Sequence, residues 1–184
     1  MKAFILTTNT IDFNIAKQEV SKLLIDAKPF YAIKDNNSKV SFNKSMKYLM
    51  ETNDGVLALF EDDVIMRHNS HFHYAFDQLP SDWELCYLGA NITGAVERYS
   101  DNLFKMNGGW TTHAVIYNNP KKICEEYFDT NHMFDDWLST QIHPRGNTFI
   151  ISPMIAWQRV RKSSLWDHVA DYTQLFDGSA NKLI

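Results

Sequence analysis

The chain has 184 residues, which is enough for one domain with a sizeable hydrophobic core. With 45% apolar and 22% charged residues, its composition is ordinary for a globular protein. The net charge of -4 gives no general attraction to nucleic acid or to an anionic membrane. Binding to nucleic acid is therefore disfavoured, although a local basic run (Arg159, Arg161, Lys162) could meet phosphate.

The location of the protein is predicted from its apolar runs and its cysteines. No run approaches the ~20 apolar residues that span a bilayer, and the N-terminal MKAFILTTNT is too short in its apolar part for a signal peptide. Cys86 and Cys124 lie in apolar contexts and are expected to be buried free thiols, with a disulfide as the alternative. We expect a cytoplasmic protein without a transmembrane segment, which could still visit a membrane surface.

The first 60 residues alternate between strand and helix patterns. Short apolar runs predict strands, and apolar residues at helical spacing predict helices. The expected order is strand 3–6, helix 13–25, strand 29–34, helix 40–50 and strand 56–60. This alternation predicts an α/β domain with a mostly parallel central sheet flanked by helices.

The second half is more mixed. Strands are expected at 83–88, 103–106, 111–117 and 148–151, and helices at 120–128 and 134–142. The strands 103–106 and 111–117 flank the turn Asn107-Gly108-Gly109. From Ser163 onward the chain is polar and aromatic, and we expect it to be extended or partly ordered.

Three acidic residues, Glu61, Asp62 and Asp63, directly follow the apolar strand 56–60. Ligands of parallel sheets bind beyond the carboxyl ends of the strands, where these acids would lie. Side chains alternate along a strand, so Glu61 and Asp63 are expected on one side, where their oxygens suit Mg²⁺ or Mn²⁺. The alternative is a solvated turn whose acids make caps and surface pairs.

Five segments in order resemble glycosyltransferase family 25, the group that contains lipooligosaccharide and procollagen galactosyltransferases. ALFEDDV resembles the family's LEDDV signature, and DWELCYLG resembles the strand that follows it. TTHAVIYN resembles a Gly-Thr-His-Ala-Tyr strand, FDDWL an aspartate-containing segment, and SPMIAWQRVRKSS the closing segment. The opening ILTTNTIDF lacks the family's arginines, and Ser38–Phe42 lacks its Cys and His.

The resemblance implies a GT-A-like single domain over residues 1–165, followed by a C-terminal tail at 166–184. It also implies transfer of a sugar from a nucleotide-sugar, UDP-linked as in UDP-galactose, with inversion at the anomeric carbon. A divalent cation (Mn²⁺ or Mg²⁺) would be held by Glu61 and Asp63 and would offset the growing charge of the diphosphate. The family's habit suggests a role in lipopolysaccharide biosynthesis.

Residue roles follow from the same matches. Asp135 falls on the family's aspartate and is the candidate base, with Asp136 as the fallback; the alternative is an acidic pair favoured by a helix N-terminus. The candidate donor-binding residues are Thr7, Thr8, Asp62, His113, Gln158 and Arg159. Gly109 and Trp110 are the candidate acceptor platform, with a plain turn as the alternative.

Three histidine patterns leave alternatives open. His113 could lie in the site or be a core histidine. His71 and His73 would form a metal pair on a strand but diverge on the helix that we expect. His168 is a candidate late metal ligand.

Two other function classes compete with the transferase. A metal-dependent phosphoesterase or nuclease would use the same acids with histidines, and an inactive carbohydrate-binding relative would keep the fold. The acceptor hydroxyl could belong to a glycan, a protein side chain or a modified DNA base.

Overall fold

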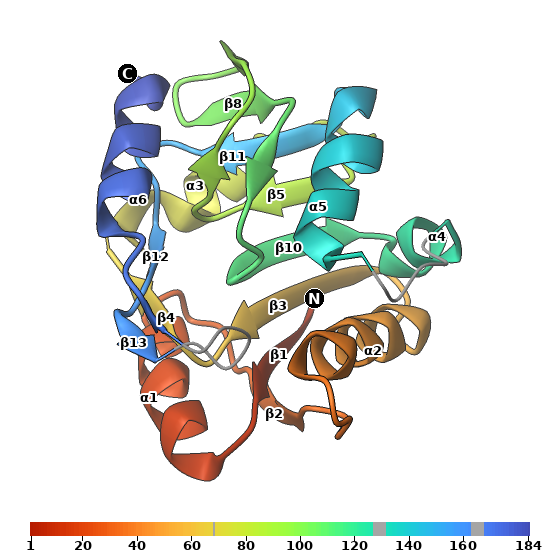
Figure 1. Cartoon of the computed structure of the whole chain (residues 1–184). Coiled ribbons are helices and arrows are strands. Elements are labelled where there is room, and N and C mark those ends of the chain that lie inside the picture. The colour runs from red at the N-terminus through yellow and green to blue at the C-terminus, as the bar shows by residue number, and fades with distance from the viewer. Residues whose placement is uncertain (68, 127–131, 163–167) are drawn as a thin grey trace.

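The computed structural model describes residues 1–67, 69–126, 132–162 and 168–184. An eight-stranded sheet runs through the molecule, and helices cover both of its faces (Figure 1). The sheet order is β2 (Lys28–Tyr31), β1 (Lys2–Thr7), β3 (Val56–Glu61), β10 (Ala114–Asn118), β5 (Leu85–Tyr87), β11 (Thr148–Ile151), β8 (Leu103–Met106) and β7 (Val96–Arg98).

The sheet is mostly parallel in direction. β1 pairs parallel with β2 and β3, and β5 pairs parallel with β11. β10 and β8 each run antiparallel to both of their neighbours, so the six remaining strands of this sheet share one direction. The predicted α/β class is confirmed.

Three small antiparallel pairs lie outside the main sheet. β4 (Val64–Met66) pairs with β12 (Ala156–Gln158), β13 (Arg161–Lys162) with β14 (Val169–Ala170), and β6 (Asn91–Ile92) with β9 (Gly109–Trp110). They are too short for a readable sequence period, and the analysis did not predict them. The β4–β12 pair brings the C-terminal basic segment beside the acidic triplet.

The first two helices start at asparagine caps. In α1 (Thr10–Ser21) the Asn9 side chain accepts from the amide of Asp12, so the helix begins before the predicted Phe13. The helix ends before the predicted Ile25, because Leu24 takes a positive φ of 59°. In α2 (Ser38–Glu51) the Asn37 side chain caps the first turn.

The later helices are shorter. They comprise α3 (Phe72–Phe76), α4 (Pro120–Glu125), α5 (Phe134–Trp137) and α6 (Thr173–Ala180). α5 continues as a π-helical turn over Leu138–Ile142, which agrees with the predicted helix 134–142. Single 3₁₀ turns occur at Asn69–His71, His143–Arg145 and Asn181–Leu183. The end of the predicted helix 120–128 lies outside the described residues.

Two hydrophobic cores lie on opposite faces of the sheet. Along β3, Leu57 and Leu59 belong to one core, while Ala58 and Phe60 belong to the other, as the alternation of a strand requires. α2, α4, α5 and α6 contribute to the first core, and α1 and α3 to the second. Both cysteines are buried and free, as expected.

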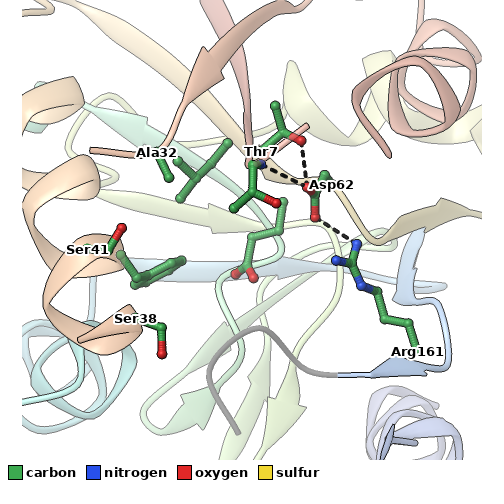
Figure 2. Close-up of a pocket in the computed structure, with 10 residues that line it drawn as sticks. Thr7, Ala32, Ser38, Ser41, Asp62 and Arg161 are labelled. Atoms are coloured by element: carbon green, nitrogen blue, oxygen red, sulfur yellow. Dashed lines mark hydrogen bonds and ion pairs between the residues drawn. The ribbon is translucent and has the colours of Figure 1, made fainter. Parts of the chain in front are cut away.

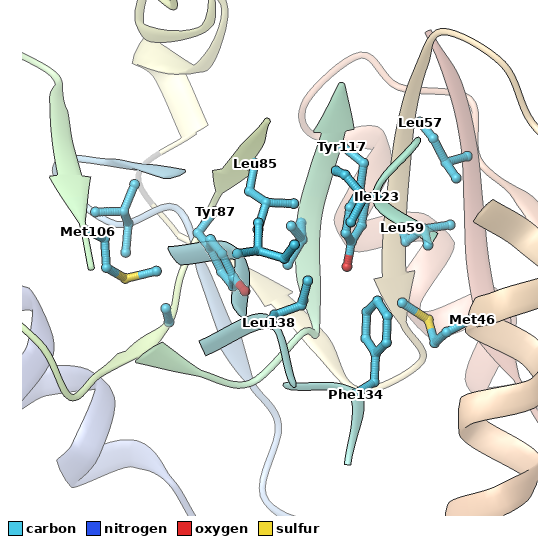
Figure 3. Close-up of a cluster of buried hydrophobic side chains, with 14 of the residues drawn as sticks. Met46, Leu57, Leu59, Leu85, Tyr87, Met106, Tyr117, Ile123, Phe134 and Leu138 are labelled. Atoms are coloured by element: carbon cyan, nitrogen blue, oxygen red, sulfur yellow. The ribbon is translucent and has the colours of Figure 1, made fainter. Parts of the chain in front are cut away.

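The first core anchors α5. Figure 3 shows Phe134 and Leu138 over Tyr87 and Tyr117 of the sheet, with Met46 of α2 beside Phe134. Phe134 and Leu138 are fully buried. This anchoring fixes the position of Asp135, which follows Phe134 directly.

Two sequence-based expectations differ from the structure in part. In the segment that was expected to be extended or partly ordered, residues 173–180 form α6, and Phe176 of α6 and Leu183 of the next turn are buried in the first core. Because polar residues and Gly178 surround them, the sequence pattern did not indicate that these two side chains are buried. The expected strand 111–117 starts only at Ala114, because Thr111 has a positive φ of 74°, and it does not pair with β8.

Candidate active site

The acidic triplet lies where β1 and β3 end and β10 begins. β1 and β3 are parallel, with Leu6 opposite Glu61, and β10 is antiparallel, with Ala114 opposite Phe60. The residues just before β10 therefore meet the residues at the end of β3. Thr112 donates a hydrogen bond of 3.1 Å from its hydroxyl to Glu61 Oε1.

Asp62 is held by the protein itself (Figure 2). Its Oδ2 accepts from the Thr7 hydroxyl at 2.6 Å and from the Thr8 amide at 3.4 Å, and its Oδ1 accepts from Arg161 Nη1 at 2.9 Å. Arg161 and Arg159 also pair with Asp12 of α1. Asp62 thus joins three segments, and both of its carboxylate oxygens are occupied.

A cavity of about 80 Å³ opens at this point between the strand ends and the first turn of α2. Asp62, Thr7 and Arg161 line one side, and Ser38, Ser41 and Ala32 line the other, as Figure 2 shows. It shares Thr8, Ala32, Ser38 and Ser41 with an open groove of about 820 Å³, which also contacts Tyr31, Lys34, Asp35 and Asn36. The two spaces form one continuous depression along the carboxyl edge of β1 and β2.

Glu61 and Asp63 are carboxyls in an unfavourable environment. Burial, then the charge of Asp63, raises the pKa of Glu61 well above its ordinary range. Burial, then the charge of Asp62, raises the pKa of Asp63 to about 6. β3 ends at Glu61, and Asp62 and Asp63 form the turn that leads to β4, so the strand alternation expected for Glu61 and Asp63 does not extend to Asp63.

Glu61 and Asp63 could supply only a few oxygen ligands to a divalent cation. Among the described residues, Asp63 Oδ1 is buried without a hydrogen-bond partner, and Asp63 Oδ2 accepts a long bond of 3.4 Å from Gln158. The same residues contain no group of three or more His, Cys, Asp or Glu side chains that could hold a metal. A cation at Glu61 and Asp63 would therefore have to be of the kind that takes one or two carboxylates and completes its shell with water and phosphate oxygens.

Asp135 lies in a second cavity, of about 220 Å³, together with Trp110, Thr111 and Tyr172. Its Oδ2 accepts from the Thr111 amide at 3.5 Å. Burial, then the charge of Asp136, raises the pKa of Asp135. The charge of Asp135 in turn helps to raise the pKa of Glu61, so the second cavity is electrostatically coupled to the triplet.

The remaining predicted residues are distributed around these cavities. Arg159 donates an amide hydrogen bond of 2.7 Å to the carbonyl of Asp63 but does not line the cavity of about 80 Å³. Asp136 is exposed and lines the second cavity. Trp110 is 45% exposed there, whereas Gly109 is buried and its amide donates to Ser139 Oγ at 3.3 Å. Gly109 is thus a packing position rather than a contact surface.

His113 lies in the core. It is fully buried, its ring packs edge-on against Phe176 at 5.0 Å, and burial lowers its pKa to about 4. This burial argues against direct contact between His113 and a donor, which was one of the alternatives for this residue. Its carbonyl accepts from the Glu61 amide at 2.9 Å, so it positions the acidic strand end through the backbone.

The other histidines do not join the acids. His71 bonds to the carbonyl of Pro153 at 2.9 Å, and His73 packs against Phe72 in α3. His71 lies on a 3₁₀ turn and His73 on α3, so the HxH segment has the helical backbone that was expected. His168 is exposed at the start of the last described segment.

The sequence analysis missed Tyr172 and Thr112. Tyr172 lines the second cavity with Asp135, and burial, followed by the charges of Asp135, Asp63 and Glu61, raises its pKa. Tyr172 belongs to the segment that was expected to be an extended tail. Thr112 lies within the TTHA segment, where only the histidine was singled out.

Comparisons with known proteins support the fold. No family model and no curated protein sequence matches the chain. Among solved structures, A197 from STIV is similar, with a TM-score of 0.53 and 15% identity over 93% of this chain and 97% of that one. A glycosyltransferase involved in the glycosylation of the major capsid of PBCV-1 has a TM-score of 0.50 and 9% identity over 82% of this chain and 81% of that one.

At these identities the likeness concerns the fold alone. The chain has a GT-A-like architecture, so the predicted fold is confirmed. Membership of family 25 stays a prediction, since no family model matches. No helix among the described residues is long and apolar enough to cross a membrane.

Proposed function

We propose that the protein is a metal-assisted, inverting glycosyltransferase that uses a nucleotide-sugar, UDP-linked by the family 25 resemblance. The observation that carries the proposal is the placement of three carboxyls. Glu61 lines the cavity at the ends of β1 and β3, Asp135 lines the second cavity, and Asp63 lies in the turn that follows Glu61. Each of these carboxyls has a raised pKa, caused first by burial. Perturbed carboxyls that converge in a cleft are typical of catalytic sites.

The depression between β1, β2 and α2 is suited to the donor. Tyr31 is 52% exposed there and offers an aromatic face to a nucleobase. The first turn of α2 and the guanidinium of Arg161 supply positive potential for a diphosphate. Asp62 holds Arg161 and Thr7 in place, so it acts by positioning rather than as a free ligand.

Glu61 and Asp63 would hold the divalent cation, with Gln158 as a neighbour of Asp63. When bound, such a cation supplies Lewis-acid stabilisation of the leaving diphosphate. Burial is the first cause of the raised pKa of each carboxyl, and the charge of Asp63 is the second cause for Glu61. Mn²⁺ and Mg²⁺ both suit these oxygen donors.

Asp135 is the proposed base. Inversion requires a carboxylate that takes the proton of the acceptor hydroxyl on the face opposite the leaving group. Asp135 lies in the second cavity, beside the exposed Trp110 and apart from the donor depression. Its raised pKa brings its proton affinity closer to neutral pH, which favours general-base catalysis.

The competing phosphoesterase or nuclease has less support. Such an enzyme needs a dense metal cluster, and the described part of the chain holds no group of three potential His, Cys or carboxylate ligands. His113, its best histidine candidate, is enclosed in the core. If a donor binds but is not turned over, the protein is an inactive carbohydrate-binding relative.

The test is release of nucleoside diphosphate from a panel of UDP- and GDP-sugars, with Mn²⁺ or Mg²⁺, in the presence and absence of glycoside acceptors. The proposal expects release that requires metal, rises with an acceptor and is accompanied by a new glycoside of inverted configuration. Phosphate release from simple phosphoesters without sugar transfer would replace the proposal with the hydrolase. Donor binding with no release under any condition would indicate an inactive relative.

A further inference from the structure

The cavity around Asp135 has the lining of a carbohydrate site. Trp110 is 45% exposed and forms one wall, and Tyr172 is partly buried and forms another. Aromatic faces stack on the apolar C–H face of a sugar ring. The Asn91 amide, the Thr111 hydroxyl and the carboxyls of Asp135 and Asp136 supply polar groups for ring hydroxyls.

The charge of this cavity selects against anionic acceptors. None of its lining residues in the described part of the chain is lysine or arginine, and two are aspartates. Carboxylates repel phosphate, so a nucleic-acid backbone or a phosphorylated sugar would meet a local negative potential. The cavity of about 80 Å³ at the strand ends differs in charge, because Arg161 lines it.

A further space adjoins the cavity around Asp135 and shares Asp136 with it. It measures about 330 Å³ and is lined by Asp136, Trp137, Thr140, Gln141 and His132. Asp136 is common to both spaces, so a chain of sugar rings that starts at Asp135 could continue along α5. Trp137 supplies an aromatic side chain there, and Thr140 and Gln141 supply polar groups.

We infer that the acceptor is an uncharged glycan, whose reacting ring lies between Trp110 and Tyr172 and whose next ring lies against Trp137 and Gln141. This inference rests on the proposed function and adds the chemical class of the acceptor. The alternative of a DNA base is thereby placed second, because its backbone is anionic.

The test measures binding of acceptor probes to the whole protein by saturation-transfer NMR, with and without UDP and Mg²⁺. The probes are methyl glycosides of neutral hexoses, methyl glycosides of the matching disaccharides, hexose 6-phosphates and a short single-stranded DNA. We expect neutral glycosides to bind, disaccharides to bind more tightly than monosaccharides, and the phosphorylated sugar and DNA to bind at least tenfold more weakly.

Matched variants assign the binding to this cavity. Trp110→Ala should weaken glycoside binding at least tenfold, whereas Trp110→Phe should retain most of it, because stacking needs an aromatic face. Gln141→Ala should weaken only the disaccharides. Tyr74→Ala, at a 63% exposed tyrosine of α3 outside this cavity, is the control and should change nothing.

The outcomes separate this inference from the proposed function. Donor binding is measured in parallel by thermal shift with nucleotide-sugars and metal. If donors bind and either no neutral glycoside binds, DNA or sugar phosphate binds equally well, or Trp110→Ala has no effect, the inference is overturned alone. If glycosides bind at Trp110 but no donor stabilises the protein, the transferase proposal fails while the carbohydrate site stands.

Discussion

Arg161 Nη1 lies 2.9 Å from Asp62 Oδ1, and this contact closes a loop of nearly a hundred residues at the edge of the sheet. Asp62 also binds Thr7 through its other oxygen, so the middle acid of the triplet stabilises the local structure. On either side, Glu61 accepts from Thr112, and Asp63 Oδ1 has no hydrogen-bond partner among the described residues; both are the ligands that we propose for a cation. The three acids therefore divide into one positioning residue and two candidate ligands.

Arg161 should matter more for donor binding than Arg159. Charge-assisted hydrogen bonds contribute about 1.5–3 kcal/mol, so Arg161→Ala should weaken nucleoside diphosphate binding at least about tenfold. Arg159→Ala removes an ion pair to Asp12 but no wall of the cavity, so its effect should be smaller. Isothermal titration with UDP and Mg²⁺ checks both; equal losses would contradict the assignment.

Asp63→Asn should stabilise the metal-free protein and abolish its response to metal. The folded state raises the pKa of Asp63 from 3.8 to about 6, so ionising this group near neutral pH costs stability. The gain in the free energy of unfolding should be on the order of 3 kcal/mol, or several degrees in Tm. Asp101→Asn, at an exposed loop aspartate, is the control for differential scanning fluorimetry.

The same pKa shift predicts a pH dependence with a defined sign. Between about pH 4 and 6 the folded protein binds more protons at Asp63 than the unfolded chain, so this group's ionisation lowers stability as pH rises through that window. The stability difference between Asp63→Asn and the native protein should therefore grow from pH 4 to 6 and then level off. A difference that is constant with pH would show that the Asp63 pKa is ordinary.

Asp135→Asn should separate chemistry from binding. The amide keeps the size of the side chain but cannot accept a proton, so the transfer rate should fall by about 10²–10⁴. Donor binding should be unchanged, because Asp135 does not line the donor depression. Asp136→Asn is the matched control at the neighbouring residue. If Asp136→Asn loses transfer and Asp135→Asn does not, Asp136 is the base instead of Asp135.

Phe176→Ala should show that the C-terminal helix belongs to the core. Phe176 is fully buried and packs against His113, so its truncation should cost about 3–5 kcal/mol in the free energy of unfolding. The adjacent Leu175 is 48% exposed, and Leu175→Ala should cost less than about 1 kcal/mol. Urea denaturation checks both, and equal small effects would show that α6 is detached.

The sequence predicted most of the sheet because its strands are apolar and bounded by turns. Strands 103–106 and 148–151 agree with β8 and β11 residue for residue. α6 was missed because Phe176, its one buried apolar core residue, stands among polar residues; Leu183, the next buried residue, lies in the following 3₁₀ turn. The two- and three-residue strands leave no period to read.

The site was predictable only in part, for a similar reason. The three acids were singled out because they follow an apolar strand. The neighbouring sequence does not reveal that Arg161 binds Asp62 or that Tyr172 lines the same cavity as Asp135. Those relationships depend on the β4–β12 pairing and on the start of α6, both of which are tertiary. The two alternatives for His113 could not be separated from the sequence, because a strand pattern does not say which polar residue is enclosed; the structure places this side chain in the core.

The central claim is that Glu61 and Asp63 hold a cation that binds the donor diphosphate. The most direct measurement is a thermal shift of the native protein and of Asp63→Ala with UDP-sugars, with and without Mn²⁺. A ligand that binds only the folded state raises its Tm. The account predicts a shift that requires both sugar nucleotide and metal and that disappears in Asp63→Ala. A shift that is equal without metal, or that persists in the variant, would contradict it.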